Sequence, residues 1–298
     1  MNDKPTGSSL LGGWLSAAGV VCIWSGWLVV SRLGVIQTLT IYDMMALRFA
    51  VAIVAVSPFI WRYWPRHMRL WQIILISFGQ GVPFMMLAFG GLQFAPAAHA
   101  AVVTNGTLPI FAAIIGWIWM KDRPDRWRIF GIAVILVGCS LIGWDRDTVG
   151  AGPDSWIGHL MFAGGGLLVA INLIATKTWG LTGMQAMVSI PTINLAWFAP
   201  VYLAFLPKAL DRAPWPEILL QAGYQGVLPS LVGVLLFTNA IRTIGTTPTA
   251  AMMAMVPAGA ALLAIPVLGE WPSLYAWAGI FLASAGIRLA AGWRPGRG

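Results

Sequence analysis

About ten continuous apolar stretches, each long enough to cross a lipid bilayer, take up most of this 298-residue chain. Because the stretches are continuous and do not alternate over short segments, they predict membrane-spanning helices and not the strands of a β-barrel. Only 9% of the residues are charged, whereas about 25% is usual for a protein whose surface faces water. The sequence therefore predicts an all-α integral membrane protein with little mass outside the bilayer.

The expected spans follow the apolar stretches in chain order, and short loops make consecutive helices antiparallel neighbours. They are residues 12–31, 42–64, 70–94, 97–120, 127–144, 156–176, 184–206, 217–242, 247–268 and 274–293. No linker in the chain is long enough to separate two independently folding domains.

The distribution of Lys and Arg predicts the orientation, because short cytoplasmic loops carry an excess of these residues. With ten spans both termini share one side, which holds 13 of the 18 Lys and Arg residues. The five on the other side are Arg32, Arg48, Arg146, Lys208 and Arg212. We therefore expect both termini in the cytoplasm of a bacterium, with the chain in its inner (plasma) membrane. The net charge of +8 then reflects topology, and no nucleic-acid partner is expected.

Residues of the same character recur at fixed spacings in the two halves of the chain. At a spacing of 148, Pro109 recurs as Pro257, Asp122 as Glu270, Pro124 as Pro272, Gly131 as Gly279 and Gly138 as Gly286. At a spacing of 145, Gly13 recurs as Gly158, Gly19 as Gly164, Arg32 as Lys177 and Gln80 as Gln225. Each unit holds five spans, an odd number, so the second must enter the membrane from the opposite face. We expect two inverted five-helix repeats, residues 1–148 and 149–298, around a central cavity on their pseudo-two-fold axis.

The end of each unit resembles the EamA-type repeat of the drug/metabolite transporter superfamily. The first copy runs from Ala98 through Pro109 and Lys121-Asp122-Arg123-Pro124 to Gly131 and Gly138. The second runs through Pro257 and Gly269-Glu270-Trp271-Pro272 to Gly279 and Gly286. The first copy has Lys-Asp-Arg where Gly-Glu-Arg is more usual, a departure that concerns a loop. The resemblance implies a ten-helix transporter over the whole chain, and the sequence is similar to bacterial inner-membrane exporters of aromatic amino acids.

The resemblance also implies which helices line the central cavity, and it makes polar and aromatic residues on them candidates for substrate binding. These candidates are Trp24, Gln80, Thr104, Asn172, Tyr224 and Met252. Gln80 and its counterpart Gln225 each precede a proline that frees backbone groups, as a substrate site would require. The alternative for the amides is interhelical hydrogen bonding, and for the aromatic rings it is packing. The two spans with glycines seven residues apart, 127–144 and 274–293, are expected to stay peripheral, packed within the chain or between subunits.

Few titratable groups fall inside the expected spans. Asp43 is the only carboxylate there, near one end of its span, so we do not expect a mid-membrane carboxylate to drive transport. For Arg48 we favour an interfacial ion pair with Asp43 over a contact with a substrate carboxylate, because the arginine can snorkel outward. We do not expect His99, His159 and the carboxylates to form a cluster for metal or acid–base chemistry. No cofactor, metal site or enzymatic activity is therefore expected.

Together these observations predict the export of small amphipathic metabolites, with aromatic amino acids as the best candidates, by alternating access. A multidrug exporter, or an exporter of other metabolites, is the alternative within transport. From a different class, the alternative is a membrane-embedded lipid enzyme or a structural subunit. The expected partners are a small-molecule substrate and membrane lipid, and a monomer is favoured although the sequence leaves the oligomeric state open.

Overall fold

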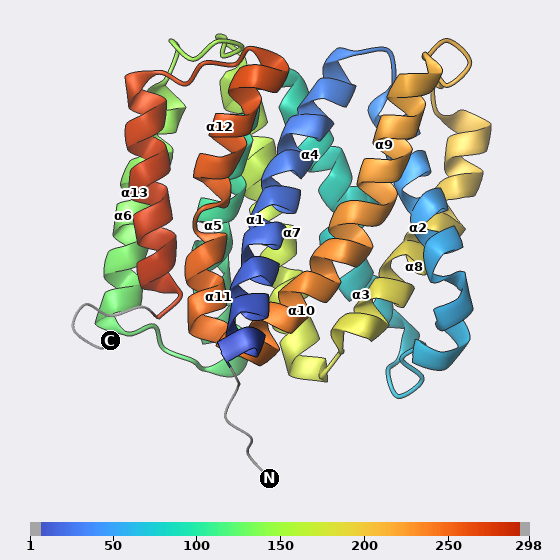
Figure 1. The fold of residues 1–298 in the computed structure, drawn as a ribbon, viewed down its shortest axis with the longest axis horizontal. Coiled ribbons are helices and arrows are strands. Elements are labelled where there is room, and N and C mark those ends of the chain that lie inside the picture. Colours follow the sequence, from blue (N-terminus) through green and yellow to red (C-terminus); the bar gives the residue numbers. More distant parts are fainter. Residues whose placement is uncertain (1–6, 293–298) are drawn as a thin grey trace.

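A computed structural model of the chain describes residues 7–292, and these residues form an all-helical bundle. Helix α1 (Gly7–Ile36) begins and α13 (Leu274–Ala290) ends at the same edge of the bundle, the lower edge in Figure 1. Within the described residues, nine spans are long and apolar enough to cross a membrane, and α13 is a shorter apolar helix of 17 residues. The expected all-α membrane architecture is confirmed. Lys4, Trp293, Arg294 and Arg297, on which parts of the span and charge predictions rest, lie outside the described residues.

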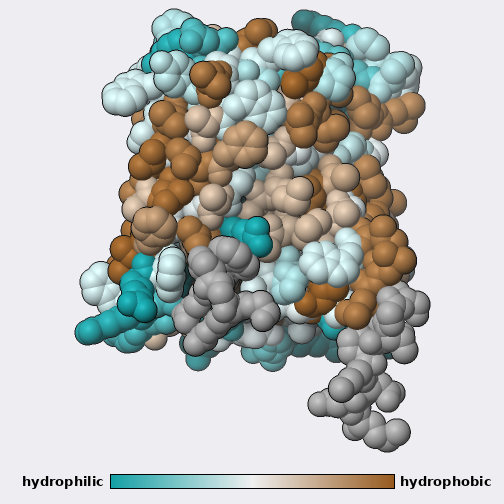
Figure 2. All heavy atoms as spheres, turned by 60° about the vertical axis from the view of Figure 1, so that its left-hand side comes forward, coloured by the Kyte–Doolittle hydropathy of each residue, from teal (hydrophilic) through white to brown (hydrophobic). Residues whose placement is uncertain are grey.

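Apolar side chains form a belt around the middle of the molecule, between more hydrophilic upper and lower edges (Figure 2). Large side chains point outward in it; for example, Ile118 is 67% and Phe281 65% exposed. Leaving apolar surface in water costs about 25 cal/mol per Å². A belt of this kind is therefore stable only against lipid.

Six of the expected spans are single uninterrupted helices along most of their length. Besides α1, these are α2 (Ile41–Tyr63), α5 (Ala97–Met120), α6 (Arg126–Trp144), α7 (Ser155–Trp179) and α8 (Gly183–Phe205). Three others are each divided. They consist of α3 (Leu70–Gln80) with α4 (Val82–Phe94), of α9 (Trp215–Val227) with η1 (Leu228–Val232) and α10 (Gly233–Ile244), and of α11 (Thr246–Met253) with α12 (Val256–Leu268).

Each division lies next to a proline, which lacks the N–H that would bond to the carbonyl four residues earlier. Pro83 lies in the first turn of α4, Pro229 lies in the π-helical turn η1, and Pro257 lies in the first turn of α12. The prolines were visible in the sequence. The expectation of one continuous helix across each of them was wrong, because the freed backbone groups find other partners.

The break between α3 and α4 is held by a side chain from another helix. Gly81 is extended there, with φ −99° and ψ −150°. The Asn194 Oδ1 atom on α8 accepts from the Val82 amide (2.9 Å), and its Nδ2 donates to the Ser77 carbonyl (3.1 Å). Backbone groups inside a bilayer must be satisfied within the protein, so Asn194 fixes the position of this break.

The helices of the two halves make corresponding contacts. Helix α1 packs on α10 and α12, and its counterpart α7 packs on α4 and α5; likewise α2 packs on α9, and α8 packs on α3. Exchanging corresponding helices turns each contact into another observed one. A pseudo-two-fold axis in the membrane plane would give such an arrangement, and the inverted relation of the complete halves stays a prediction supported by these contacts.

Helices α6 and α13 lie side by side at one end of the bundle, on the left in Figure 1. A Cβ atom added to Gly131 would lie 2.8 Å from the Gly286 carbonyl, and one added to Gly138 would lie 2.8 Å from the Gly279 carbonyl. The glycines therefore allow the two backbones to touch, as small residues do between membrane helices. Of the two interpretations left open, packing within the chain is the one observed.

Candidate functional site

A cavity of about 420 Å³ lies between the two halves, a volume typical of small-molecule sites. Most of its wall is apolar. Its polar and charged lining residues come from α2, α3, α5, α7 and η1: Arg48, Gln80, Thr104, Asn105, Asn172, Thr176 and Ser230. Its aromatic lining residues are Trp24, Trp27, Phe49, Phe84 and Phe237. Helices α6 and α13 contribute no lining residue, as expected for peripheral helices.

Four of the six candidate residues, Trp24, Gln80, Thr104 and Asn172, line this cavity. Tyr224 and Met252 are not among its lining residues. The Tyr224 hydroxyl donates to the Ile23 carbonyl of α1 (3.0 Å), so it joins α9 to α1. Met252 lies on α11, and the cavity reaches that span only at Val256, past the division between α11 and α12.

The two repeat-related glutamines differ in their surroundings. Gln80 ends α3 with an exposed side chain that lines the cavity. Gln225 is fully buried: its Oε1 accepts from Trp27 Nε1 (2.7 Å), and its Nε2 donates to Ser31 Oγ (3.0 Å) and Gln221 Oε1 (3.2 Å). The substrate-contact interpretation therefore fits the placement of Gln80, and the interhelical hydrogen-bond interpretation fits Gln225.

The expected ion pair between Arg48 and Asp43 is wrong. Asp43 caps the start of α2: its Oδ2 accepts from the Thr40 amide (2.9 Å) and the Ala209 amide (3.0 Å), and its Oδ1 accepts from the Tyr202 hydroxyl. Arg48 does not snorkel toward the interface but lines the cavity. Five residues separate the two positions, which is well over one helical turn, so the side chains leave α2 in different directions.

Two asparagines present oxygen atoms at the cavity. Asn105 Nδ2 donates to the Ala101 carbonyl (2.8 Å) and Asn172 Nδ2 donates to the Ile76 carbonyl (2.8 Å). Because the nitrogen of each amide is used in this way, its Oδ1 is left as the group available to a ligand. Among the described residues, none donates to either oxygen. Asn105 was missed by the sequence analysis, which treated it only as part of an inaccessible loop-type motif within a span.

One edge of the cavity is closed by a buried ion pair. Arg32, in the last turn of α1, lies with its Nε 2.8 Å from the Glu270 Oε1 in the loop between α12 and α13. Arg32 also donates to the Leu92 carbonyl at the end of α4, and Glu270 Oε2 accepts from the Ala97 amide at the start of α5 (2.9 Å). Four elements are therefore tied together at the upper edge in Figure 1.

At the lower edge no such closure is present among the described residues. The repeat counterparts of Arg32 and Glu270 are Lys177 and Asp122, and both are exposed. Asp122 instead lies 3.8 Å from Arg128 Nη1. The cavity lining extends to Thr176 near the end of α7 and to Gly183 at the start of α8, which both lie toward this edge. The cavity thus extends toward the edge where α1 begins and α13 ends.

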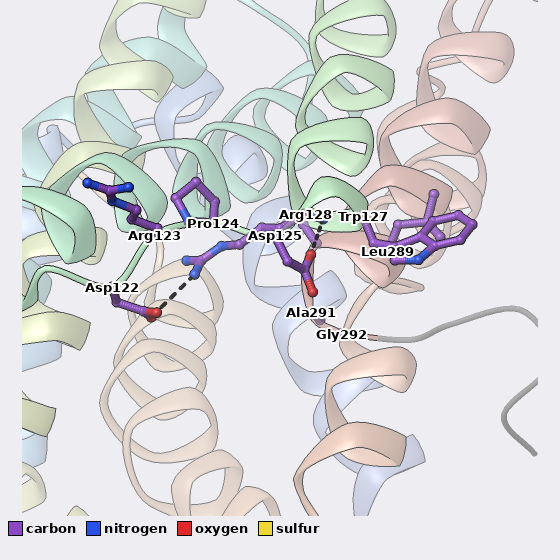
Figure 3. A pocket seen from close by; sticks show the side chains of 10 residues that line it. Asp122, Arg123, Pro124, Asp125, Trp127, Arg128, Leu289, Ala291 and Gly292 are labelled. Carbon is purple, nitrogen blue, oxygen red and sulfur yellow. Dashed lines mark hydrogen bonds and ion pairs between the residues drawn. The ribbon is translucent and has the colours of Figure 1, made fainter.

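A smaller hollow of about 380 Å³ lies at the lower edge, between the loop that precedes α6 and the end of α13 (Figure 3). It is lined by the loop side chains Asp122, Arg123 and Asp125 and by Leu289 at the end of α13. None of its lining residues belongs to the central cavity, so we treat it as a surface feature of the loop.

A chain of titratable side chains lies beyond the closed edge, contrary to the expectation that these residues would not cluster. His99 Nε2 lies 3.0 Å from Asp145 Oδ2, and His99 Nδ1 lies 3.0 Å from His159 Nε2. Burial by itself raises the pKa of Asp145, but hydrogen bonds from His99, Thr148, Ser273 and the Asp147 amide lower that pKa well below its usual range. The cluster therefore joins α5, α6 and α7 to the start of α13.

The chain matches the model of the EamA-like transporter family twice, over residues 11–144 and over residues 156–292. It is 23% identical over 226 residues to a protein named an uncharacterized transporter, YyaM, of Bacillus subtilis, covering 70% of this chain and 69% of the relative. It is 23% identical over 230 residues to a probable terminal-alkyne amino-acid exporter of Streptantibioticus cattleyicolor, covering 76% and 74%. A solved crystal structure has a TM-score of 0.60 with 19% identity, covering 95% of this chain and 96% of that one, and so shares the fold.

Proposed function

This chain belongs to the EamA-like transporter family, and from that premise we propose that it exports small amphipathic metabolites, with aromatic amino acids as the best candidates. The observation that carries the proposal is the central cavity, where aromatic rings and neutral polar groups face the same space. The relative named an amino-acid exporter supports the same substrate class.

The proposed site consists of Trp24, Gln80, Thr104 and Asn172, together with Asn105 and Trp27. Taking a zwitterion out of water is costly unless its charged ends find polar partners. Amide and hydroxyl groups supply those partners without a tight fixed-charge pair, so the substrate can be released. The rings of Trp24 and Trp27 would receive an aromatic side chain, since offset ring contacts add to apolar burial. Tyr224 and Met252 would act behind this wall, if at all, through Trp24 and α12.

Alternating access would use the two halves as two nearly equivalent packings around the cavity. The closed upper edge and the cavity extension toward the lower edge support a state open to the side of the termini. With both termini in the cytoplasm of a bacterium, as the charge distribution predicts, this side is where an exporter takes up its substrate from the cell.

Transport of labelled amino acids by the purified protein in liposomes tests the proposal. We expect phenylalanine, tyrosine or tryptophan to accumulate by counterflow well above protein-free liposomes, and glutamate and lysine to remain near the background. Counterflow of organic cations alone would instead favour a multidrug exporter. Turnover of lipid without any transport would favour a membrane-embedded enzyme.

A further inference from the structure

The cavity has a single charged lining residue, Arg48 of α2. An ionisable side chain inside a membrane span is costly, and such residues face a cavity and meet a partner there. Arg48 lies among the apolar and neutral residues of the cavity wall. Its presence needs a reason, because the cost of burying an unpaired charge is large.

Within the described residues, Arg48 forms no ion pair. The carboxylates on the neighbouring elements already have partners. Asp43 caps α2, and Glu217 at the start of α9 accepts from the Thr38 amide (3.1 Å) and the Leu39 amide (3.0 Å). Glu270 is held by Arg32. No carboxylate of the protein is left to neutralise the guanidinium in the cavity.

The guanidinium is held from one side only. Its Nη1 donates to the Gln225 carbonyl (3.3 Å) and to Gln225 Oε1 (3.4 Å), and its carbon lies 6.0 Å from the centre of the Trp27 ring. Pro229 explains the first contact, because it has no N–H to bond the Gln225 carbonyl four residues earlier. Nη2 and Nε have no acceptor among the described residues. These nitrogens are the donors that a ligand can use.

Gln225 is a positioning residue in this arrangement. Its amide is fixed by Trp27 and Ser31, so that its Oε1 is presented to Arg48. The planar guanidinium, held in this way, matches the two oxygens of a carboxylate. The Trp27 ring also stacks on Phe84, with ring centres 6.0 Å apart, and provides an apolar surface next to the charge.

We propose that Arg48 makes the cavity selective for substrates that carry a carboxylate attached to an apolar or aromatic body. This inference rests on the proposed function and names the charge class of its substrates. A carboxylate is required, because only it neutralises Arg48. An ammonium group is tolerated, since the Asn105 and Asn172 oxygens accept from it without a full negative charge. An aromatic amine without a carboxylate is rejected, because it would place a second positive charge in the cavity.

The test uses three probes that share one ring: L-phenylalanine, 3-phenylpropionate and 2-phenylethylamine. For the wild type in liposomes, we expect an excess of 3-phenylpropionate to inhibit counterflow of labelled phenylalanine, and an excess of 2-phenylethylamine not to. In parallel, the acid and phenylalanine should raise the melting temperature of the purified protein, and the amine should not, because a ligand stabilises the state that binds it. The melting measurement does not depend on transport.

Arg48→Gln should weaken the binding of both carboxylates by about 10- to 100-fold, the usual value of a hydrogen bond to a charged group. It should remove the preference for the acid over the amine. Arg48→Lys, which keeps the charge without the fork, should retain part of it. Arg62→Gln is the matched control, because Arg62 is exposed near the other end of the same helix. It should behave like the wild type.

The outcomes separate this inference from the proposed function. Stabilisation by carboxylates that depends on Arg48, without phenylalanine counterflow, would support the inference and refute phenylalanine as the substrate. Phenylalanine counterflow that 2-phenylethylamine inhibits as well as the acid, or that survives Arg48→Gln unchanged, would refute the inference alone. A wild type that neither transports nor is stabilised by any probe would count against both.

Discussion

Arg32 and Glu270 lie 238 residues apart in the chain and form an ion pair with 2.8 Å between Nε and Oε1. Their side chains are only 10% and 6% exposed. Their repeat counterparts, Lys177 and Asp122, are both exposed, and Asp122 approaches Arg128 instead. The same motif position therefore closes the cavity at one edge and is free of that role at the other.

We expect Glu270→Gln to destabilise the protein by about 3 to 5 kcal/mol, because breaking a buried pair leaves Arg32 charged and unpaired. Asp122→Asn, at the corresponding position of the other repeat, should cost less than about 1 kcal/mol, as exposed ion pairs do. Thermal melting of the two purified variants by size-exclusion chromatography measures the difference. Equal losses in both would mean that the Arg32–Glu270 pair is not the closure.

Gly138→Ala should also be destabilising, because the added Cβ would lie 2.8 Å from the Gly279 carbonyl and from the Ala283 amide nitrogen. Backbone atoms cannot move aside as a flexible side chain can, so α6 and α13 must separate. The loss is expected to be about 1 to 3 kcal/mol, the usual cost of overpacking. Gly143→Ala is the control on the same helix, because nothing lies within 4 Å of its Cβ position. A melting temperature for Gly138→Ala that matches the control would contradict the close contact.

Asp145 gives the protein a stability that depends on pH. Its pKa in the folded protein is well below the usual range, so it stabilises the folded state above its unfolded pKa of about 4. This stabilisation is lost as the pH falls through the folded pKa. Asp145→Asn should therefore lower the melting temperature near neutral pH, and the gap to the wild type should shrink in acid.

The matched control for Asp145 is Asp154→Asn, because Asp154 is an exposed residue in the same connection between α6 and α7. Its melting temperature should follow that of the wild type at every pH. The prediction fails if Asp145→Asn and Asp154→Asn melt together near neutral pH.

Gln80→Ala and Trp24→Ala should each reduce the resistance of cells to a toxic phenylalanine analogue. Gln80 offers its amide to the cavity and Trp24 lines the cavity with its ring. Trp61→Ala is the control, because the Trp61 ring is 83% exposed on the outside of α2. Growth at increasing analogue concentration, at matched protein levels, measures the effect. Normal resistance in both cavity variants would place the substrate elsewhere.

The orientation prediction can be tested with fusions to Gly298. A reporter that is active only outside the cytoplasm should give no signal there, because 13 of the 18 basic residues lie on the side of the termini. A reporter that is active only in the cytoplasm is the paired control and should give full signal. The reverse pattern would overturn the orientation and the direction of transport that follows from it.

The sequence by itself determined the membrane class, the position of ten spans, and the recurrence of motifs in two halves. These are properties of segments: the cost of placing apolar or polar groups in lipid depends on composition over about 20 residues. The four cavity residues that the sequence analysis predicted, Trp24, Gln80, Thr104 and Asn172, lie on spans found in this way. The prolines that divide three of the spans were equally visible.

Only the tertiary structure decided which partner each polar group has. Arg48 and Asp43 are close in sequence, yet Asp43 caps its helix and Arg48 reaches Gln225, whose carbonyl Pro229 has freed. His99, His159 and Asp145 form a cluster that no spacing announced. The physical reason is that a hydrogen bond or ion pair acts over about 3 Å in space, whatever the separation in sequence. Hydropathy places a helix in the membrane, but only packing sets its rotation and its neighbours.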